Sequence, residues 1–419
     1  MSLKRRELLA AASLAALGAP RARSAARPRV VVVGGGWGGA SAARALRQMS
    51  AGAVEVLLVE ASPRFVSTPM SNLVVAGLRE PQVLEHSYEG LARHWGVQLV
   101  HEQALAIDAD RRELRLASGR RLAYDRLLLS PGIEMMWEAV DGARAEHDAG
   151  RVLHAWQGGA EALALRRQID AMRPGGVLAI AIPEAPLRCP PAPYERACLV
   201  AERLQRINPR AKLLVLDANA EPASEAAQFL QVFRERYAGM IEYRPEHAVI
   251  GVEAQRLRFE VQDDVQADVI NLLPPMRAGA LAVQAGLANS NGRWVRVRWR
   301  DFSATAAEHI HVIGDAVQSE NAMAKSGAMA MAQGEVVAAA LVAELTGREP
   351  ALPDALAGAC YSYTSRGAAL ALKTVHRFDT GTQAWQPDAG ARVVSEVPEA
   401  ALADEAWRWA EASWKRLLT

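Results

Sequence analysis

Residues 29–39 have the sequence RVVVVGGGWGG, and this stretch decides the fold. Its run of four valines is typical of a buried strand, and the glycines after it allow a tight turn. A helix-forming segment, Ala40–Met49, comes next, and a second strand-like segment, Glu55–Val59, ends in Glu60. A strand, a glycine turn, a helix and a second strand that ends in an acid together predict a dinucleotide-binding α/β unit.

The spacing Gly34-x-Gly36-x-x-Gly39 gives each of these glycines a separate function. The first turns the chain, the second lets the backbone approach a pyrophosphate, and the third lets the helix pack on the strand. Free N–H groups at the helix start then face the phosphates. Glu60 follows Gly39 by 21 residues and is expected to accept hydrogen bonds from the adenosine ribose. The predicted cofactor loop comprises Gly34, Gly35, Gly36, Trp37, Gly38 and Gly39.

The strand and helix pattern restarts at about residue 150. Val177–Ile182 and Lys212–Leu216 are strand-like, and Tyr194–Arg206 between them is helical. This alternation predicts a second doubly wound unit. Its first strand is followed by Pro183-Glu184-Ala185-Pro186 instead of a glycine loop. Proline has no N–H group, and side chains here would block a pyrophosphate, so we expect no nicotinamide site.

The length and composition of the chain agree with this organisation. A chain of 419 residues is too long for one ordinary domain, and 50% hydrophobic residues suffice for a large core. The predicted fold is α/β, with two doubly wound (Rossmann-like) domains and a small C-terminal α+β module. The net charge of +1 gives no reason to expect nucleic acid as a partner. No uninterrupted apolar run reaches the roughly 18 residues of a membrane span.

The N-terminus has the pattern of an export signal. Lys4, Arg5 and Arg6 precede the apolar stretch Leu8–Ala19, and the small residues Ser24–Ala26 follow it. A basic head, an apolar middle and a small-residue exit predict a secretory signal over residues 1–26. The adjacent arginines indicate the twin-arginine route, which carries folded proteins. We therefore expect a periplasmic protein that acquires its cofactor before export.

Two later segments carry the resemblance that distinguishes FAD from NAD. Tyr124–Gly132 (YDRLLLSPG) looks like the segment of two-dinucleotide flavoproteins that returns to the FAD domain. His311–Ala316 (HVIGDA) resembles their second FAD motif, whose acid, here Asp315, binds the ribityl chain. Asp315 could also cap a helix. The resemblance adds to the cofactor site Ser130, Pro131, Gly132, Gly314 and Asp315.

The chain contains three cysteines, Cys189, Cys198 and Cys360. In an oxidising compartment they predict one disulfide and one free thiol, and the sequence leaves three possible pairs. Cys189 lies where the missing glycine loop would face the flavin, before a helix whose dipole should lower its pKa. Cys198, within that helix, is expected to be a small buried residue.

The most specific segments of the chain resemble the flavin subunit of flavocytochrome c sulfide dehydrogenase, a relative of the sulfide:quinone reductases. The resemblance spans nearly all of the mature chain, and it implies a redox-active Cys189–Cys360 disulfide beside the isoalloxazine. It also implies sulfide as the substrate and a separate periplasmic c-type cytochrome as the acceptor, since the chain has no C-x-x-C-H motif. The segments are Arg188–Ala197 (RCPPAPYERA), Asn271–Gly279 (NLLPPMRAG), Lys325–Gly327 and the surroundings of Cys360.

One departure from that family concerns how the flavin is held. The family often tethers FAD through a cysteine in the segment that here reads STPMSN, and Thr68 stands at the matching position. We therefore expect FAD to be bound without a covalent bond. Lys325 is a candidate for holding the substrate anion, although it could equally be a solvated charge at a helix start. No metal is expected.

Three alternative functions remain open at this point. A sulfide:quinone reductase would need an apolar membrane-docking surface, for which Trp407, Trp409 and Trp414 are candidates. A thiol or disulfide oxidoreductase could use the same cysteines on other sulfur compounds. A non-catalytic flavoprotein could assist a sulfur-oxidising complex, although it would have no need for both cysteines. The predicted domains are residues 28–150 with 265–346 for FAD, 151–264 for the second unit and 350–419 for the C-terminal module.

Overall fold

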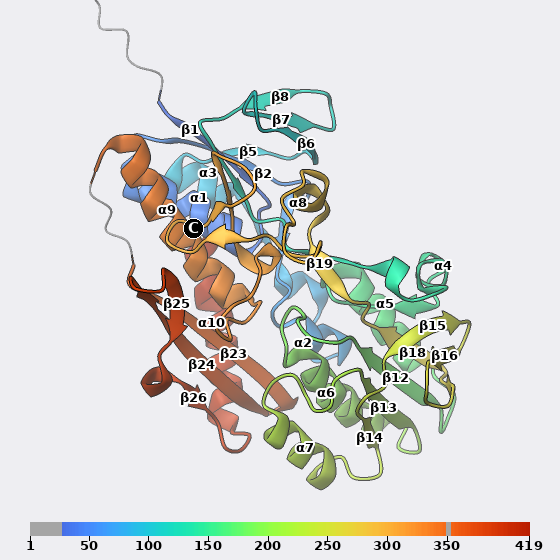
Figure 1. Ribbon diagram of the computed structural model, residues 1–419. Coiled ribbons are helices and arrows are strands. Elements are labelled where there is room, and N and C mark those ends of the chain that lie inside the picture. The colour runs from blue at the N-terminus through green and yellow to red at the C-terminus, as the bar shows by residue number, and fades with distance from the viewer. Residues whose placement is uncertain (1–26, 349–352) are drawn as a thin grey trace, which may run out of the picture.

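The computed structural model describes residues 27–348 and 353–419 of the chain (Figure 1). Two units built on mainly parallel sheets and a C-terminal module of sheet and helix make up these residues. The predicted export signal at residues 1–26 lies outside the described residues and stays a prediction.

A seven-stranded sheet in the order β20-β21-β22-β9-β1-β2-β5 is the centre of the first unit. The five strands from β22 to β5 are parallel, and β20 and β21 add to the edge in antiparallel fashion. Val30, Val31 and Val32 of β1 are fully buried, as expected of a parallel sheet covered on both faces. The strands are β1 (Arg29–Val33), β2 (Glu55–Val59), β5 (Gln98–Val100), β9 (Arg126–Leu129), β20 (Val297–Arg298), β21 (Ser303–Ala304) and β22 (Ile310–Val312).

Helices α1 (Trp37–Met49) and α9 (Gly327–Thr346) pack closely against each other beside this sheet. A Cβ on Gly334 of α9 would lie 2.7 Å from the carbonyl oxygen of Gly38, so the contact needs glycine. Within the described ranges, only α9 is long and apolar enough to span a membrane. However, 61% of that stretch is buried, and α9 packs between α1 and β23 (Ala355–Ser365). Its apolar composition is therefore that of a core helix.

Smaller elements complete the first unit. They include a three-stranded antiparallel sheet, a two-stranded sheet and short helices. They are β3 (Arg64–Val66), β4 (Glu85–Ser87), β6 (Ala104–Asp108), β7 (Glu113–Leu116), β8 (Arg121–Ala123), α2 (Ser71–Val75), α3 (Glu89–Trp95) and α8 (Ala280–Gln284).

The second unit is built on a parallel sheet in the order β11-β18-β12-β13-β14. Its strands are β11 (Val152–Leu153), β12 (Val177–Ile182), β13 (Lys212–Asp217), β14 (Ile241–Arg244) and β18 (Val269–Leu272). Its helices are α4 (Ala143–Asp148), α5 (Gly159–Asp170), α6 (Ala192–Ile207) and α7 (Ala226–Glu235). A small antiparallel sheet of β15 (Val249–Glu253), β16 (Arg256–Phe259) and β17 (Val265–Gln266) adjoins them.

The predicted boundary between residues 264 and 265 is placed too early. Strand β18 pairs in parallel with both β11 and β12, so the second unit extends to Leu272. Beyond it, β19 (Met276–Ala278) pairs with β10 (Ile133–Met135), and this antiparallel ribbon joins the two units where the chain leaves the first and returns.

The C-terminal module is a sheet covered by a long helix (Figure 1). Strand β24 (Ala368–Asp379) pairs with β23, β25 (Ala384–Pro387) and β26 (Val393–Val394), and α10 (Ala400–Leu418) packs on β24. Strand β23 also contacts α9 of the first unit and α6 of the second. The module therefore closes over the junction of the two units.

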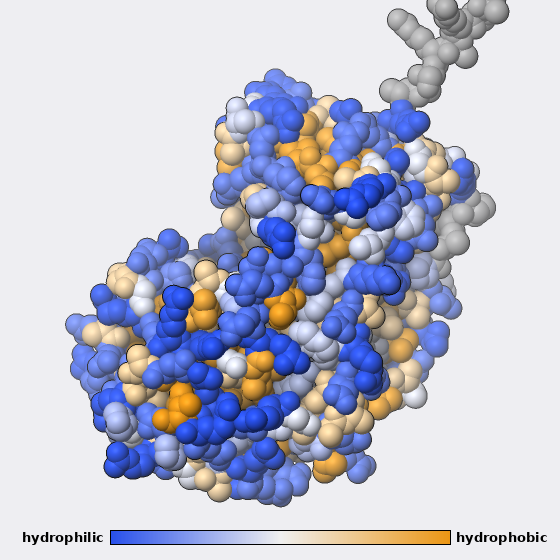
Figure 2. All heavy atoms as spheres, turned by 180° about the vertical axis from the view of Figure 1, so that it is seen from behind, coloured by the Kyte–Doolittle hydropathy of each residue, from blue (hydrophilic) through white to orange (hydrophobic). Residues whose placement is uncertain are grey.

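The tryptophans of α10 do not form an exposed apolar surface. Trp414 is buried, and Trp409 stacks on Trp37 of α1 with ring centroids 5.4 Å apart. The partly exposed Trp407 lies under the guanidinium of Arg79. The face seen in Figure 2 is mainly hydrophilic, with small separate hydrophobic patches. These tryptophans are therefore a packing feature, and they give no support to the membrane-docking alternative.

Candidate functional site

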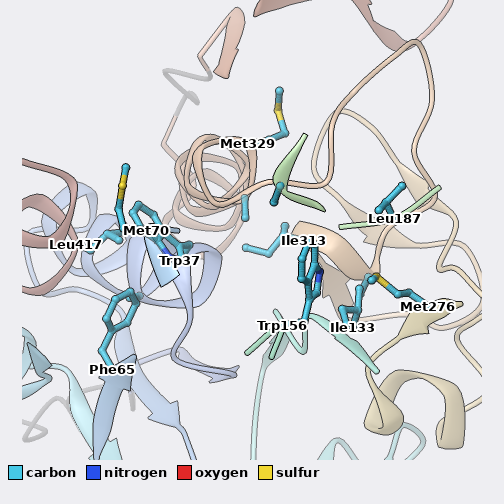
Figure 3. Close-up of a cluster of buried hydrophobic side chains, with 14 of the residues drawn as sticks. Trp37, Phe65, Met70, Ile133, Trp156, Leu187, Met276, Ile313, Met329 and Leu417 are labelled. Atoms are coloured by element: carbon cyan, nitrogen blue, oxygen red, sulfur yellow. The ribbon is translucent and has the colours of Figure 1, made fainter. Parts of the chain in front are cut away.

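One cavity is lined by residues from all three parts of the structure. Gly36 lines it from the first unit, Cys189 from the second and Cys360 from the C-terminal module. Trp37, Met70 and Trp156, which also line it, belong to the buried hydrophobic cluster of Figure 3. The cavity therefore lies where the three parts meet.

The glycine loop has the geometry that its spacing predicts. Gly34 has a φ of +94°, and a Cβ there would lie 2.3 Å from the carbonyl oxygen of Ser130. A Cβ on Gly39 would lie 1.8 Å from the carbonyl oxygen of Gly34, so the helix can approach the strand only without a side chain. Gly36 has no heavy atom within 4 Å of its Cβ position and faces the cavity. The loop therefore offers an open cradle at Gly36.

Helix α1 begins at this cradle with its first N–H groups available. Its N-cap is Gly36, and no side chain caps it. The N–H groups of a first helical turn have no partner within the helix, and they attract phosphate. The carboxylate of Glu60 accepts hydrogen bonds from the N–H groups of Gly35 (2.7 Å) and Ser62 (2.9 Å). Glu60 thus holds the loop, and its contact with a ribose stays a prediction.

The second predicted FAD motif reaches the same cavity. Asp315 lines it, and burial raises the pKa of this carboxyl group. Its Oδ1 atom is buried and has no hydrogen-bond partner among the described residues. An orphaned buried oxygen needs a ligand that donates a hydrogen bond, and the hydroxyl groups of a ribityl chain are such donors. With the open cradle at Gly36, this orphaned oxygen makes the residues present fit FAD.

Asp315 does not cap a helix in the way the sequence allows. It lies in a single 3₁₀ turn, Gly314–Ala316, and α9 begins eleven residues after the end of that turn, at Gly327. Ser326 is the N-cap of α9, and its hydroxyl accepts a hydrogen bond from the N–H of Met329 (3.3 Å). The N-cap interpretation of Asp315 is therefore wrong.

The predicted cofactor residues divide into two groups. One group lines the cavity, and the other lies behind it and supports the loop. The cavity-lining residues are Gly36, Trp37, Gly38, Thr68, Ser130, Gly132, Gly314 and Asp315. The supporting residues are Gly34, Gly35, Gly39, Glu60 and Pro131.

Cys189 and Cys360 both line this cavity, although they come from different units. Cys189 lies in the segment of nine residues between β12 and α6, where a glycine loop is missing. Its backbone is in the left-handed region with a φ of 55°, a conformation that non-glycine residues rarely adopt and that clusters at functional sites. Cys198 is fully buried and lies outside the cavity, as expected.

Burial dominates the acidity of both thiols in the cavity. It raises the pKa of Cys189 well above the ordinary value, and the neighbouring Arg188 lowers it only in part. It raises the pKa of Cys360 to about 12, against a hydrogen bond to Ser326 that lowers it. The expectation of a lowered pKa for Cys189 is therefore wrong, because the burial of the thiol outweighs the effect of the neighbouring Arg188. All three cysteines carry free thiols here, so the disulfide stays a prediction.

A buried network of polar side chains stands beside the cysteines. Glu195 accepts hydrogen bonds from the Asn72 side chain (2.6 Å) and from the N–H of Tyr363 (3.0 Å). Burial raises the pKa of Glu195 to about 7. The side-chain oxygen of Asn72 accepts a hydrogen bond from Nε of Arg196 (2.9 Å). Glu195 can therefore exchange a proton near neutral pH, within a network that fixes its position.

Lys325 is neither a solvated charge at a helix start nor a residue of the cavity that could hold the substrate anion. It is only 4% exposed, so it is not a solvated charge. Its ammonium donates to the carbonyl oxygens of Asp315 (2.9 Å) and Val317, and it lies 3.7 Å from the centre of the Trp294 ring. Burial lowers its pKa to about 7, and Lys325 does not line the cavity. The cations that line the cavity with the cysteines are Arg188 and Arg196 instead.

Sequence reasoning assigned no role to Arg188, Glu195 or Arg196, although all three lie within the RCPPAPYERA segment. The only indication of a role in the sequence was that three charged residues occur among apolar residues near the start of a helix. Charged residues are mostly solvated, and only burial reveals that these three surround the cysteines. Trp156 gave no signal in the sequence.

Comparison with protein families gives two matches. Residues 162–274 match the family described as the central part of the sulfide dehydrogenase [flavocytochrome c] flavoprotein chain. Residues 28–166 match the pyridine nucleotide-disulphide oxidoreductases. The flavoprotein chain of sulfide dehydrogenase [flavocytochrome c] from Chlorobaculum thiosulfatiphilum is 54% identical over 46 residues, which are 11% of this chain and 94% of that sequence.

Longer relatives are more distant. The mitochondrial sulfide:quinone oxidoreductase of Mus musculus is 23% identical over 308 residues, 68% of this chain, and the match spans 65% of that protein's length. The solved sulfide:quinone oxidoreductase of Aquifex aeolicus superposes with a TM-score of 0.77 and 18% identity, covering 93% of this chain and 91% of that one. Putidaredoxin reductase superposes with a TM-score of 0.64 and 22% identity, covering 84% of this chain and 82% of that one. These structures confirm the two-dinucleotide-domain fold.

Proposed function

The chain belongs to the family of the flavoprotein chain of flavocytochrome c sulfide dehydrogenase, relatives of the sulfide:quinone oxidoreductases, and we propose that it oxidises sulfide. Its cofactor is FAD. Gly36, Trp37 and Gly38 would hold the pyrophosphate, and Asp315 would hold the ribityl chain. When bound, FAD accepts the two electrons that sulfide gives up.

The observation that carries the proposal is the meeting of Cys189 and Cys360 in the cofactor cavity. The two cysteines are far apart in the sequence and come from different units, so chance would seldom bring them together. Cys189 lies in the segment that replaces the glycine loop of the second unit, and we infer that it takes the position where a nicotinamide would otherwise approach. A dithiol in this position can pass electrons between sulfur and a flavin.

The proposed reaction starts with a Cys189–Cys360 disulfide. The sulfur of hydrosulfide attacks one cysteine sulfur, the bond between the two cysteines breaks, and a persulfide and a thiolate result. Hydrosulfide loses two electrons and one proton in a full turnover, and its sulfur is left at oxidation state zero. Glu195 lies close enough to the cysteines to influence their pKa values and can accept that proton at its carboxylate.

The proposed acceptor is a c-type cytochrome subunit in the periplasm. This chain has no haem-binding C-x-x-C-H motif, so the proposed cytochrome would be a separate protein. The family name, flavocytochrome c, supports a cytochrome. Export through the twin-arginine route, proposed from residues 1–26, would bring the folded flavoprotein to that compartment.

A quinone is the second candidate acceptor, favoured by the likeness to sulfide:quinone oxidoreductases over most of the described fold. The inward packing of Trp409 and Trp414 gives no support to it. The two acceptors can be compared directly on the reduced protein, since each would oxidise the flavin at its own rate.

The decisive experiment is an anaerobic titration of the purified holoprotein with sulfide, followed by flavin absorption. We expect stoichiometric bleaching by sulfide, followed by rapid recovery on addition of oxidised c-type cytochrome and slow recovery with a soluble quinone. Flavin that stays oxidised in excess sulfide would refute the function. Faster recovery of the flavin absorption with the quinone would indicate that a quinone, and not a cytochrome, is the acceptor.

A further inference from the structure

The guanidinium of Arg188 lies in the cavity without an acceptor for its N–H groups. Arg188 lines the cavity directly before Cys189 and is partly exposed to it. Its backbone N–H contacts the sulfur of Met276 at 3.4 Å. No hydrogen bond or ion pair of its guanidinium occurs among the residues that the structure describes. Five N–H donors without an acceptor inside a protein call for an anion.

Arg196 lines the same cavity, but its guanidinium, unlike that of Arg188, is hydrogen-bonded to other groups of the protein. Its guanidinium donates to the Asn72 side chain (2.9 Å) and to the carbonyl oxygens of His154 (2.8 Å) and Ala155 (2.6 Å). It also donates to the side chain of Asn271 (2.8 Å). Four of its five N–H donors are therefore used within the protein, and Arg196 acts as a structural clamp.

Both guanidinium groups lie over the ring of Trp156. Its ring centroid lies 4.9 Å from Cζ of Arg196 and 6.0 Å from Cζ of Arg188. Arg196 clamps the backbone directly before this tryptophan, through the carbonyl oxygens of His154 and Ala155. A fixed aromatic face next to Arg188 limits where its guanidinium can lie. The position of Arg188 beside Cys189 is therefore supported by the fold.

The carboxyl groups of the cavity do not cancel this positive charge. Asp315 and Glu195 are the two acids that line it, and neither forms an ion pair with Arg188 in the described structure. Burial raises the pKa of both carboxyl groups, and Arg188 partly counteracts this at Asp315. Arginine remains charged in proteins, so the surroundings of Cys189 carry a positive charge that an incoming anion can neutralise.

We propose that Arg188, with Trp156 as its supporting wall, forms an anion subsite beside Cys189 that receives small anions directly before they reach the cysteine sulfur. The identity of the reacting anion as hydrosulfide rests on the proposed function. The subsite raises the local concentration of the anion next to the sulfur that it attacks. Neutral thiols gain nothing from it, and other small anions of similar size compete for it.

The kinetic test uses the holoprotein and three variants. Arg188→Met removes the charge at similar length, and Arg188→Lys keeps it. Arg300→Met is the matched control, because Arg300 also lies over an aromatic ring, that of Phe378 at 4.8 Å, but is exposed and outside the cavity. We expect Arg188→Met to raise the KM for sulfide roughly 10- to 100-fold, the range of a charge-assisted hydrogen bond, with kcat nearly unchanged. Arg188→Lys should restore much of the KM, and Arg300→Met should behave as the wild type.

The binding test needs no sulfide. The holoprotein is reduced with dithiothreitol and alkylated with iodoacetamide, with and without nitrate, and mass spectrometry measures the alkylation of each cysteine. Nitrate is planar, fits a guanidinium, and carries no sulfur. It should slow alkylation of Cys189 in the wild type and in Arg300→Met, and leave it unchanged in Arg188→Met. The FAD content of each variant is measured in the same samples.

Each outcome has a definite meaning. An unchanged KM with no protection by nitrate would overturn the subsite. Loss of FAD from Arg188→Met with retention in Arg188→Lys would overturn it too, because the arginine would then belong to the cofactor site. A wild-type flavin that sulfide does not bleach would refute the proposed function alone, and protection of Cys189 by nitrate would still support the subsite.

Discussion

The backbone N–H of Cys189 donates a hydrogen bond of 2.8 Å to the carbonyl oxygen of Lys325. The next residue, Ser326, hydrogen-bonds the sulfur of Cys360 and caps helix α9. Two consecutive residues therefore hold both cysteines, and the start of a buried helix of 20 residues fixes those two residues. The sequence motif Lys325-Ser326-Gly327 therefore supports the cysteine pair. The ammonium group of Lys325 points away from the cysteines, toward the carbonyl oxygens of Asp315 and Val317.

The two cysteines of the cavity are expected to be equally necessary. Cys189→Ser and Cys360→Ser should each abolish bleaching of the flavin by sulfide, because neither leaves a sulfur that can form the disulfide. Both should retain FAD, since neither residue belongs to the glycine loop. Cys198→Ser is the control, and it should keep the wild-type rate because Cys198 lies outside the cavity. Full activity of Cys360→Ser would remove the basis of the mechanism.

Glu195 should give the reaction a dependence on pH near neutrality. Its pKa is raised to about 7 by burial, so the carboxylate that accepts a proton forms as the pH rises through that value. The substitution Glu195→Gln should lower the rate of flavin reduction by sulfide about 10²- to 10⁴-fold, the usual contribution of a general base. The measurement is anaerobic stopped-flow absorption at saturating sulfide.

Sulfide itself changes protonation with pH, so the informative quantity is the ratio of wild-type to Glu195→Gln rates. This ratio should rise with pH up to about 7 and then level off. A ratio that does not change with pH would show that Glu195 only shapes the cavity.

Two glycines of the loop should respond differently to the same substitution. Gly36→Ala places a methyl group in open space at a φ of −67°, so the fold should be retained while the pyrophosphate is obstructed. We expect FAD to bind at least roughly tenfold more weakly, about 1.4 kcal/mol. Gly39→Ala puts the methyl group 1.8 Å from the Gly34 carbonyl oxygen, and it should cost about 1–3 kcal/mol of stability or more. Calorimetric FAD titration of the apoprotein and thermal unfolding measure the two effects, and equal losses of stability would contradict the distinction.

FAD should leave the protein when the chain is denatured. Thr68 lines the cavity at the position where the family often has its tethering cysteine, and a hydroxyl group is a poor substitute for that thiol. Acid precipitation of the holoprotein should therefore leave yellow FAD in the supernatant and a colourless pellet. Flavin that remains with the precipitated chain would show a covalent bond at another residue.

NADH and NADPH should not reduce the flavin at a significant rate. The segment between β12 and α6 has nine residues with prolines in place of a glycine turn, whereas only three residues separate β1 from α1. Anaerobic mixing of the holoprotein with either nucleotide should leave the flavin oxidised over minutes, with dithionite as the positive control for reduction. Rapid bleaching by NADH would mean that the second unit binds a nucleotide by other contacts.

The sequence by itself determined the parts that depend on short-range chemistry. Gly34, Gly36 and Gly39 are required by turn geometry and close approach, and these constraints act within one strand, turn and helix. The missing loop after Ile182 was visible for the same reason, since proline removes N–H donors wherever it stands. Strand β12 was predicted with its observed bounds, because its apolar run is bounded by clear turn residues.

Only the tertiary structure decided which charged and polar groups serve the site. Lys325 and Arg188 are both cationic residues in the sequence, but packing turns the lysine toward the carbonyl oxygens of Asp315 and Val317 and leaves the arginine in the cavity. The raised pKa of Cys189 likewise reflects burial by surrounding units, which outweighs the effect of the neighbouring Arg188. Burial and the direction of a side chain depend on contacts between residues far apart in the chain, and local sequence patterns do not encode them.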